Sequence, residues 1–271
     1  MSMGIRFTIL ASGSTGNASI IETADARLLV DAGLSAKKLE QLMEAREFHP
    51  RKLDGILVTH EHVDHIKGLS VLARKYELPV YANSETWKAM DKQAGDIPDT
   101  KKEIMETGSM KQFGGLCVES FAISHDAAEP VGYCFSCEGM KLSFATDLGY
   151  VSEKVLGKII DSDVLILESN HDIEMLRIGH YPWNIKRRIL SDIGHLSNEA
   201  AGEAMSHIVK EGKARRVYLA HLSRDHNVMD LAKLTVQRVV EDNGFSLTER
   251  KIKLMETYHD RPTYWDAVGM E

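Results

Sequence analysis

The segment Val58-Thr-His-Glu-His-Val-Asp-His-Ile66 places three histidines and one aspartate within six residues. It continues the apolar run Leu53 to Thr59, which is typical of a buried strand, and it opens a predicted helix from Asp64, the expected N-cap, to Tyr76. Histidines this crowded would repel one another if they were protonated. A divalent metal ion removes that cost, because neutral imidazole and carboxylate are ligands that such ions take. The segment therefore predicts a metal site where a strand ends and a helix begins.

The spacing within this segment indicates which ligands share a metal ion. His60 and His62 are two residues apart on an extended turn, so both can face one ion. Asp64 and His65 stand at the start of the helix and can face a second ion beside the first. The alternative is a chance cluster, but a core histidine is buried singly and satisfied by one or two hydrogen bonds. The crowding favours ligands.

The composition of the 271-residue chain sets few limits on its partners. A formal net charge of −7 gives no global electrostatic argument for nucleic-acid binding, so metal ions or a local basic patch would have to hold an anionic substrate. No apolar run approaches the roughly 20 residues of a membrane span, and the first residues lack a signal-peptide core. We therefore expect a cytoplasmic protein without a membrane span. The three cysteines do not make a disulfide framework.

Short apolar runs alternate with segments of helical period along the rest of the chain, which predicts two sheets with helices outside them. The expected strands are residues 5–10, 18–22, 28–31, 53–59, 79–82, 118–123, 132–136, 141–146, 164–168, 216–220 and 251–256. The expected helices are residues 36–46, 64–76, 84–90, 153–160, 197–210 and 229–242.

Three further ligand-type residues each follow a predicted strand. His125 stands in FAISHDAAEPVGY, Asp147 in LSFATDLGY and His221 in VYLAHLS. One histidine after a strand is more often an ordinary core or surface residue. Their order after the His60–His65 segment, each at a predicted strand end, resembles the ligand order of a known superfamily, and that resemblance assigns them to a shared site.

On these residues the sequence resembles the metallo-β-lactamase superfamily, from residue 5 to about residue 226. The resemblance implies an α/β (α+β) protein, a four-layer αββα sandwich of two mixed β-sheets flanked by helices. It also implies one domain over residues 1–271, with pseudo-halves of about 1–120 and 121–271. Two divalent ions, Mn²⁺ or Zn²⁺ with Fe²⁺ as a further option, would be held by His60, His62, Asp64, His65, His125, Asp147 and His221. Asp147 would bridge the ions, and Asp64 would also act in catalysis by orienting the nucleophile.

A finer resemblance rests on residues 168–202, ESNHDIEMLRIGHYPWNIKRRILSDIGHLSNEAAG. This stretch resembles the YycJ/WalJ group of bacterial metallo-β-lactamase-fold DNA exonucleases, which implies a DNA substrate and attack from a 5′ end. A substrate-binding insert of about residues 169–198 interleaves cations with aromatic rings, a pattern that suits backbone tracking and base stacking. The alternative is a surface loop with ordinary charges. The residues concerned are Arg177, Lys186, Arg187, Arg188, Tyr181 and Trp183.

His195 lies in Gly194-His-Leu-Ser-Asn198, directly before a predicted helix capped by Ser197 or Asn198. Backbone N–H groups and the positive end of the helix dipole make such a position a natural phosphate site. We predict that His195 contacts the scissile phosphate or protonates the leaving oxygen, with Ser197 in the same substrate site. The alternative is a simple capping-region histidine. His171 is expected to support the ligands rather than to be one.

The loop Leu10-Ala-Ser-Gly-Ser-Thr-Gly-Asn-Ala-Ser19 raises the question of a bound nucleotide. A phosphate-binding loop needs a lysine directly after its last glycine, and Asn17 follows Gly16 instead. Strands rather than a helix follow, so no nucleotide cofactor is expected. Residues 12–17 are either the wall of a phosphate pocket or only a tight turn, and the sequence leaves both open.

Together these features predict a metal-dependent phosphodiesterase, namely a DNA exonuclease that uses a water activated by two metal ions. Other hydrolases of the same superfamily are the enzymatic alternative. Their substrates would be RNA, a cyclic phosphodiester, or a thioester as in glyoxalase II. A catalytically weak, metal-stabilised regulatory protein is the alternative outside catalysis. Strand preference and oligomeric state do not follow from the sequence.

Overall fold

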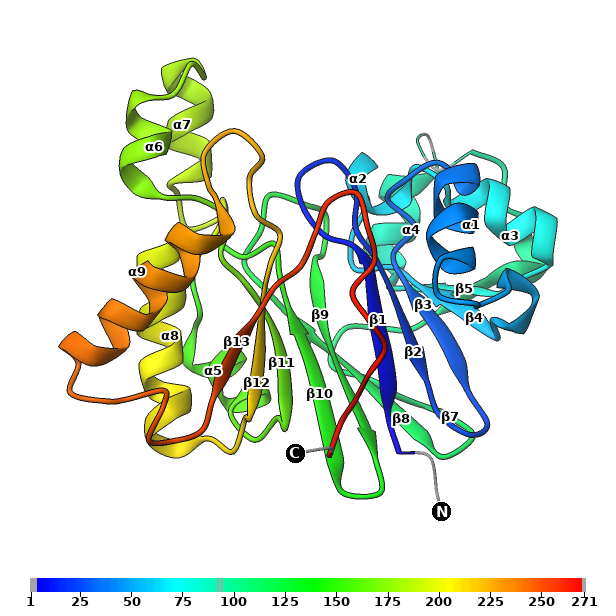
Figure 1. The fold of residues 1–271 in the computed structure, drawn as a ribbon. Helices are drawn as coiled ribbons and strands as arrows, with labels where there is room; N and C mark the ends of the chain where they lie inside the picture. The colour runs from blue at the N-terminus through cyan, green and yellow to red at the C-terminus, as the bar shows by residue number, and fades with distance from the viewer. Residues whose placement is uncertain (1–3, 92, 94, 270–271) are drawn as a thin grey trace. The chain divides into compact units, whose positions relative to one another are not determined.

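The computed structural model describes residues 4–91, 93 and 95–269. These residues cluster into two compact units, each with its own strands and helices (Figure 1). Unit 1 comprises residues 4–122, 127–140 and 257–269, and unit 2 comprises residues 123–126 and 141–256. The chain therefore leaves unit 1 and returns to it. None of the helices in the described ranges is long and apolar enough to cross a membrane.

Unit 1 is built on a sheet with the strand order β14-β1-β2-β3-β4-β5-β6. Strands β14, β1, β2 and β3 pair antiparallel, whereas β3, β4, β5 and β6 pair parallel. These strands are Arg6–Ala11 (β1), Ala18–Glu22 (β2), Arg27–Val30 (β3), Gly55–Leu57 (β4), Val80–Ala82 (β5), Lys102–Ile104 (β6) and Asp266–Ala267 (β14). The helices are Ala36–Glu44 (α1), Val63–Ile66 (α2), Leu69–Tyr76 (α3) and Ser84–Met90 (α4), with 3-10 turns at Pro50–Lys52 (η1) and Asp99–Lys101 (η2).

The second sheet has the strand order β13-β12-β11-β10-β9-β8-β7. Its antiparallel strands are Met110–Phe113 (β7), Leu116–Ala122 (β8) and Val131–Cys137 (β9). Its parallel strands are Met140–Ala145 (β10), Val164–Glu168 (β11), Arg216–Ala220 (β12) and Lys253–Met255 (β13). The helices of unit 2 are Glu153–Ile159 (α5), Ile173–Ile178 (α6), Trp183–Ile189 (α7), Asn198–Glu211 (α8) and Met229–Asp242 (α9).

The inner parallel strands, such as β4, β5 and β11, are wholly buried, which explains their continuous apolar sequences, whereas the edge strands β6 and β13 are not buried. All five residues of β11, Val-Leu-Ile-Leu-Glu, are buried, the terminal Glu168 included. In unit 1 the apolar faces of α1 and α3 supply Leu39, Met43 and Leu72 to a core cluster that also contains strand residues such as Ile56. Because the carboxyl ends of neighbouring parallel strands meet at one edge of a sheet, residues that follow those ends gather there. This edge is where each unit carries its ligand-type side chains.

The predicted fold class is confirmed: the chain is an α/β protein with two mixed β-sheets and flanking helices. The single helix predicted over residues 64–76 is wrong, because the chain forms α2 and α3 with Gly68 between them. A Cβ at Gly68 would lie 2.3 Å from the carbonyl oxygen of Leu34, so the backbone turns here at close approach to another segment. The N-cap of α2 is His62 rather than Asp64.

The hairpin of α6 and α7 was not predicted, because helices of six and seven residues are too short for a clear 3.6-residue period. The prediction of one domain with pseudo-halves near residue 120 stays a prediction. The described units divide the chain differently, since residues 127–140 and 257–269 belong with the N-terminal part.

Candidate metal centre

The histidines of the His60–His65 segment lie against one another in unit 1, just beyond the end of β4. The ring centroids of His60 and His62 are 4.6 Å apart, and those of His60 and His65 are 4.1 Å apart. His60 and His65 are buried, whereas His62 and Asp64 are partly exposed. The segment thus brings three imidazoles together, and one of them, His62, is partly exposed.

A buried carboxylate, Asp31, orients this histidine cluster from the end of β3, the strand next to β4. Asp31 accepts hydrogen bonds from the backbone N–H and the hydroxyl of Thr59, both at 2.9 Å. The same carboxylate lies 2.8 Å from Nδ1 of His65, and the Thr59 hydroxyl lies 3.0 Å from Nδ1 of His60. Because Nδ1 of each ring has an outer partner, the atom that would bind a metal ion is Nε2. Histidines that bind metals are commonly held in this way.

In unit 2 the ligand-type side chains come from three neighbouring strands rather than from one segment. Asp147 follows β10, Glu168 ends β11 and His221 follows β12. The strand order puts β11 in the middle, so Glu168 lies between the other two strand ends. His195 joins them from the loop before α8. One side-chain oxygen or nitrogen from each of these four residues lies within 4.8 Å of the other three.

Glu168 is fully buried and holds two imidazoles at once. Its Oε1 lies 2.7 Å from Nδ1 of His195 and 3.0 Å from Nδ1 of His221, and its Oε2 accepts the backbone N–H of Leu148 at 2.8 Å. Burial alone would raise the pKa of Glu168, but the two histidines outweigh it and bring that pKa below its ordinary value. The carboxylate therefore stays ionised and selects Nδ1 as the donor in both rings.

The donor atoms of His221 and Asp147 fit a divalent cation. Nε2 of His221 lies 3.2 Å from Oδ1 of Asp147, and both side chains are buried. Two ligand atoms at about 2.1 Å from one ion, at a roughly tetrahedral angle, are separated by a similar distance. Imidazole and carboxylate donors without thiolate suit Zn²⁺, Mn²⁺ or Fe²⁺.

His125 follows the same pattern in unit 2. Its Nδ1 donates to the carbonyl oxygen of Gly194 at 3.0 Å, and its ring centroid lies 4.9 Å from that of His195. Burial lowers the pKa of His125, although the carboxylate of Asp147 acts in the opposite direction. A lowered pKa keeps the imidazole neutral, which is the form that binds a metal ion.

Three of the residues at these strand ends have a left-handed backbone. The φ angles are 60° at Asp31, 59° at Asp147 and 55° at His221. This conformation is uncommon for residues other than glycine and costs roughly 1–3 kcal/mol at each position. The same conformation occurs in turns elsewhere, at Glu47, Glu77, Glu138 and Lys251, so at these three positions it shows that the chain bends sharply as it leaves each strand.

The predicted substrate residues occupy different environments. The Ser197 hydroxyl accepts the backbone N–H of Ala200 at 3.2 Å and so caps α8, with the partly exposed His195 two residues earlier. Arg187 is exposed, and Arg188 pairs with Asp126.

Lys186 differs from these neighbours because its side chain is buried. Its ammonium donates to the carbonyl oxygens of Arg177 at 2.7 Å and of Gly179 at 2.6 Å. In this geometry the Lys186 ammonium stabilises the end of α6, which is a structural role rather than one in phosphate binding.

The glycine-containing loop is tied to the histidine segment of unit 1. The Asn17 side chain accepts the backbone N–H of Gly13 at 2.9 Å, and its Nδ2 lies 3.1 Å from Nε2 of His65. The backbone N–H of Asn17 donates to the carbonyl oxygen of Asp64 at 2.8 Å. The loop is therefore a tight turn that also contacts the ligand segment.

Sequence reasoning missed the supporting residues, above all Asp31 and Glu168. A signal was present, since each is an acidic residue that closes an apolar strand, as in RLLVD and VLILE. Asn170, which donates to the carbonyl oxygen of His221 at 2.8 Å, carries no such signal.

His171 is buried, and neither of its ring nitrogens has a hydrogen-bond partner among the described residues. Burial lowers the pKa of His171 to about 4.

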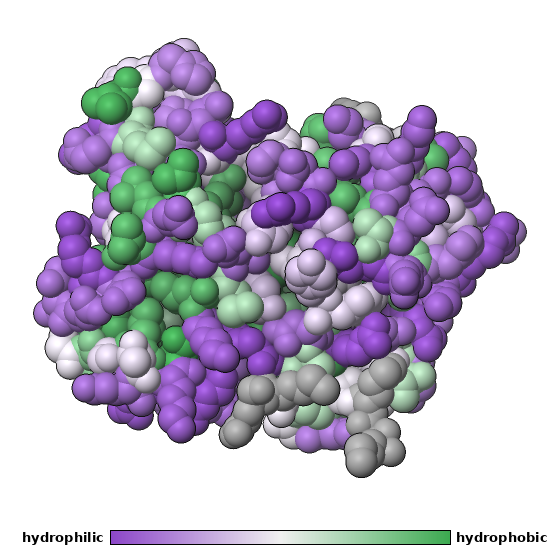
Figure 2. All heavy atoms as spheres, in the orientation of Figure 1, coloured by the Kyte–Doolittle hydropathy of each residue, from purple (hydrophilic) through white to green (hydrophobic). Residues whose placement is uncertain are grey.

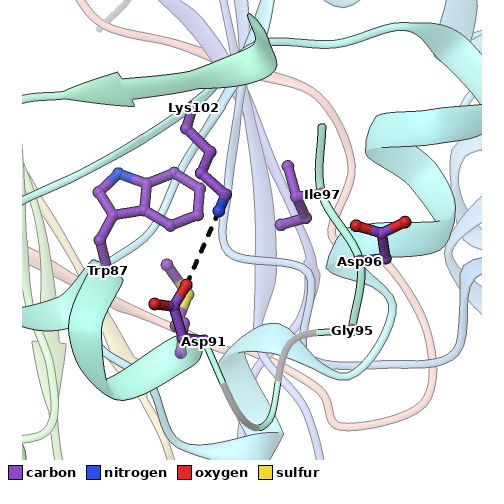
Figure 3. A pocket seen from close by; sticks show the side chains of 7 residues that line it. Trp87, Asp91, Gly95, Asp96, Ile97 and Lys102 are labelled. Atoms are coloured by element: carbon purple, nitrogen blue, oxygen red, sulfur yellow. Dashed lines mark ion pairs between the residues drawn. The ribbon is translucent and has the colours of Figure 1, made fainter. Parts of the chain in front are cut away.

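Unit 1 also has a cavity of about 360 Å³ beside α4 (Figure 3). Figure 3 shows the Lys102 side chain next to the Trp87 ring and directed toward Asp91, with 3.7 Å between Nζ and the carboxylate. Its described lining is completed by Met90, Gly95, Asp96 and Ile97 and includes no histidine. The cavity therefore lacks the ligand chemistry of the two clusters.

Comparison with known protein families identifies the family of the chain. The model for the β-lactamase superfamily domain matches residues 26–222. The chain belongs to the β-lactamase superfamily, and the predictions of that superfamily and of a metal-dependent hydrolase are confirmed.

Individual relatives share about half of their residues with this chain. The chain is 53% identical to exodeoxyribonuclease YycJ of Bacillus anthracis over 247 residues, which cover 91% of this chain and 93% of that protein. It is 46% identical to exodeoxyribonuclease WalJ of Streptococcus pneumoniae over 236 residues, 86% and 87% of the two chains. The finer resemblance to this group is therefore also confirmed. Among solved structures, Zn²⁺-bound PqqB from Methylobacterium extorquens has the same fold, with a TM-score of 0.68 at 17% identity over 95% of this chain and 99% of that one.

Proposed function

We propose that the protein is an exodeoxyribonuclease that hydrolyses DNA phosphodiesters from a 5′ end. The observation that carries the proposal is the convergence of Asp147, Glu168, His195 and His221 within 4.8 Å. This group combines metal-ligand types with a carboxylate–imidazole pair. The names of the two relatives, both exodeoxyribonucleases, supply the substrate class. A cytoplasmic location, where DNA is present, is part of the same proposal.

Two divalent ions would be held by the seven ligands predicted from the sequence. These ligands are His60, His62, Asp64 and His65 of the first motif, together with His125, Asp147 and His221. When bound, such ions supply an activated water and neutralise charge on a phosphoryl group. Mn²⁺ suits phosphodiester chemistry, and Zn²⁺ is the ion bound by PqqB, which has this fold.

His195 would act on the leaving group. Nδ1 of His195 is 2.7 Å from the ionised Glu168, so this pair leaves Nε2 as the atom that would face substrate. With its ring oriented by Glu168, His195 would pass a proton to the departing 3′ or 5′ oxygen. The N-terminus of α8, capped by Ser197, would add backbone dipoles that favour the phosphate. Asp64 would orient the attacking water.

The test uses purified protein loaded with Mn²⁺ or Zn²⁺ and DNA labelled at either its 5′ or its 3′ end. We expect mononucleotide release from the 5′ end and a loss of at least about a thousandfold in His62→Ala. Bis-p-nitrophenyl phosphate tests phosphodiester chemistry alone. Hydrolysis of S-lactoylglutathione without any phosphodiesterase activity would establish the thioesterase alternative, and folded, metal-loaded protein without either activity would establish the regulatory one.

A further inference from the structure

The α6–α7 hairpin of unit 2, residues 173–189, presents large apolar side chains to solvent. Ile178 at the end of α6 is 84% exposed, and Trp183 at the start of α7 is 60% exposed. Trp87 and Trp265, in contrast, are partly buried against the core of unit 1. Figure 1 shows α6 and α7 projecting together beyond α8 and α9, and Figure 2 shows hydrophobic residues at the surface of this region. Exposed apolar groups of this size commonly mark an interaction site.

The hairpin is held firmly at its base. The buried Lys186 ammonium bridges two carbonyl groups at the end of α6, and the Tyr181 hydroxyl donates to Asp225 at 3.0 Å. The Tyr181 ring lies edge-on to His226, with 4.4 Å between centroids. A Cβ at Gly179 would lie 2.3 Å from Nε2 of His226, so these segments are in close contact. These contacts anchor the hairpin to the segment that contains Asp225 and His226, while Trp183 remains 60% exposed.

The same hairpin is joined to His195. The carbonyl oxygen of Ile189, the last residue of α7, accepts the backbone N–H of His195 at 3.0 Å. A Cβ at Gly194 would lie 2.2 Å from that carbonyl oxygen, so only glycine allows this approach. A ligand seated on the hairpin would therefore lie on a rigid extension of the segment that carries His195.

The charge of the hairpin is opposite to that of the whole chain. Residues 173–189 contain four cations and one acid, Glu174, and so carry a net charge of +3 where the chain carries −7. Arg187 is exposed among them. A rigid aromatic side chain beside exposed cations is the arrangement by which proteins bind single-stranded nucleic acid without reading its sequence.

We propose that the α6–α7 hairpin binds an unpaired end of a DNA strand, with one base stacked on Trp183 and a neighbouring phosphate on Arg187. This inference rests on the proposed function for the identity of the nucleic acid. It specifies that the enzyme acts best on DNA whose end is unpaired. Duplex ends without an overhang would be weaker ligands, because their bases are already stacked.

The test measures binding of a fluorescent, phosphorothioate oligodeoxythymidine to the metal-loaded protein by anisotropy. We expect Trp183→Ala to bind roughly 5- to 100-fold more weakly, and Trp183→Phe to retain most of the affinity. Arg187→Ala should make the slope of log affinity against log salt concentration less steep. The change should correspond to the loss of about one phosphate contact. The control is Tyr264→Ala, an aromatic residue of unit 1 that is 85% exposed and should change nothing. With cleavable DNA, Trp183→Ala should raise KM more than it lowers kcat.

Equal affinity of Trp183→Ala and the wild type would overturn the inference. So would a change of oligomeric state in Trp183→Ala with unchanged DNA binding, because the hairpin would then pair with a second copy of the chain. Failure of the wild type to hydrolyse either DNA or bis-p-nitrophenyl phosphate would overturn the proposed function instead. The binding assay uses an uncleaved ligand and gives its result separately.

Discussion

The two ligand clusters use the same support but are encoded in different ways. In unit 1, six consecutive residues supply the cluster, and Asp31 at the end of β3 holds one imidazole and Thr59. In unit 2, the residues are dispersed between positions 125 and 221, and Glu168 at the end of β11 holds two imidazoles. A buried carboxylate behind Nδ1 is thus common to both. Because Glu168 contacts two imidazoles and Asp31 only one, we expect the dispersed cluster to depend more strongly on its central carboxylate.

The sharpest test of this comparison is Glu168→Gln. The amide keeps the shape but removes the charge that faces His195 and His221, so we expect kcat to fall by about 10²- to 10³-fold. Steady-state rates on labelled DNA, measured with metal content determined in parallel, would show the effect. Rates within a few-fold of the wild type would mean that Glu168 does not orient either ring.

The matching change in unit 1 is Asp31→Asn, which should act through metal affinity. Loss of an outer carboxylate behind a ligating histidine typically weakens metal binding by about 10- to 100-fold. Because Asp31 faces one imidazole rather than two, we expect its effect on kcat at saturating metal to be smaller than that of Glu168→Gln. Competition with a chelator measures the affinity. A larger loss of kcat at saturating metal in Asp31→Asn than in Glu168→Gln would contradict the expected order of the two carboxylates.

A third test uses the pH dependence of stability. Burial lowers the pKa of His171 to about 4, whereas an unfolded histidine has a pKa of about 6.5. The unfolded chain therefore binds the extra proton first, so stability from neutral His171 is present above pH 6.5 and is lost as the pH falls toward 4. Between pH 7 and pH 5 the loss should be roughly 2 kcal/mol.

His171→Leu should flatten this acid limb of the stability curve in urea titrations. The exposed His207→Asn is the control and should leave the slope unchanged. An unaltered slope in His171→Leu would show that this ring does not govern acid stability.

The last prediction concerns two glycines outside the clusters. Gly68→Ala would place a Cβ 2.3 Å from the Leu34 carbonyl oxygen and 2.9 Å from the backbone nitrogen of Ala36, so we expect a loss of about 1–3 kcal/mol. Gly157 in α5 has open space around its Cβ position, and Gly157→Ala should raise stability by less than about 1 kcal/mol. Thermal unfolding measures the change in stability of each variant. Equal changes would mean that the close approach at Gly68 does not constrain the junction of α2 and α3.

The sequence predicted those parts of the fold whose signal is local. Ala18–Glu22, Val164–Glu168 and Met229–Asp242 have the predicted bounds because apolar runs and helical periods report directly on burial. The split between α2 and α3 was missed, because the contact of Gly68 with Leu34 joins segments far apart in the sequence.

The same distinction between local and long-range signals applies to the candidate site. The histidine segment of unit 1 was evident because its ligands are adjacent, and Asp147 and His221 were found only through family resemblance. Glu168 was missed because its role arises from the position of β11 between β10 and β12. The burial of Lys186 could not be predicted either, since it depends on the fold of the α6–α7 hairpin.

The most direct test of the account is the metal-to-protein ratio of the folded chain after saturation with Mn²⁺ or Zn²⁺ and removal of excess ion. We predict about two ions per chain in the wild type and about one fewer in Asp147→Asn, because Asp147 lies 3.2 Å from Nε2 of His221 and would bind an ion with it. A wild type that retains no ion, or an Asp147→Asn variant that retains as many ions as the wild type, would contradict it.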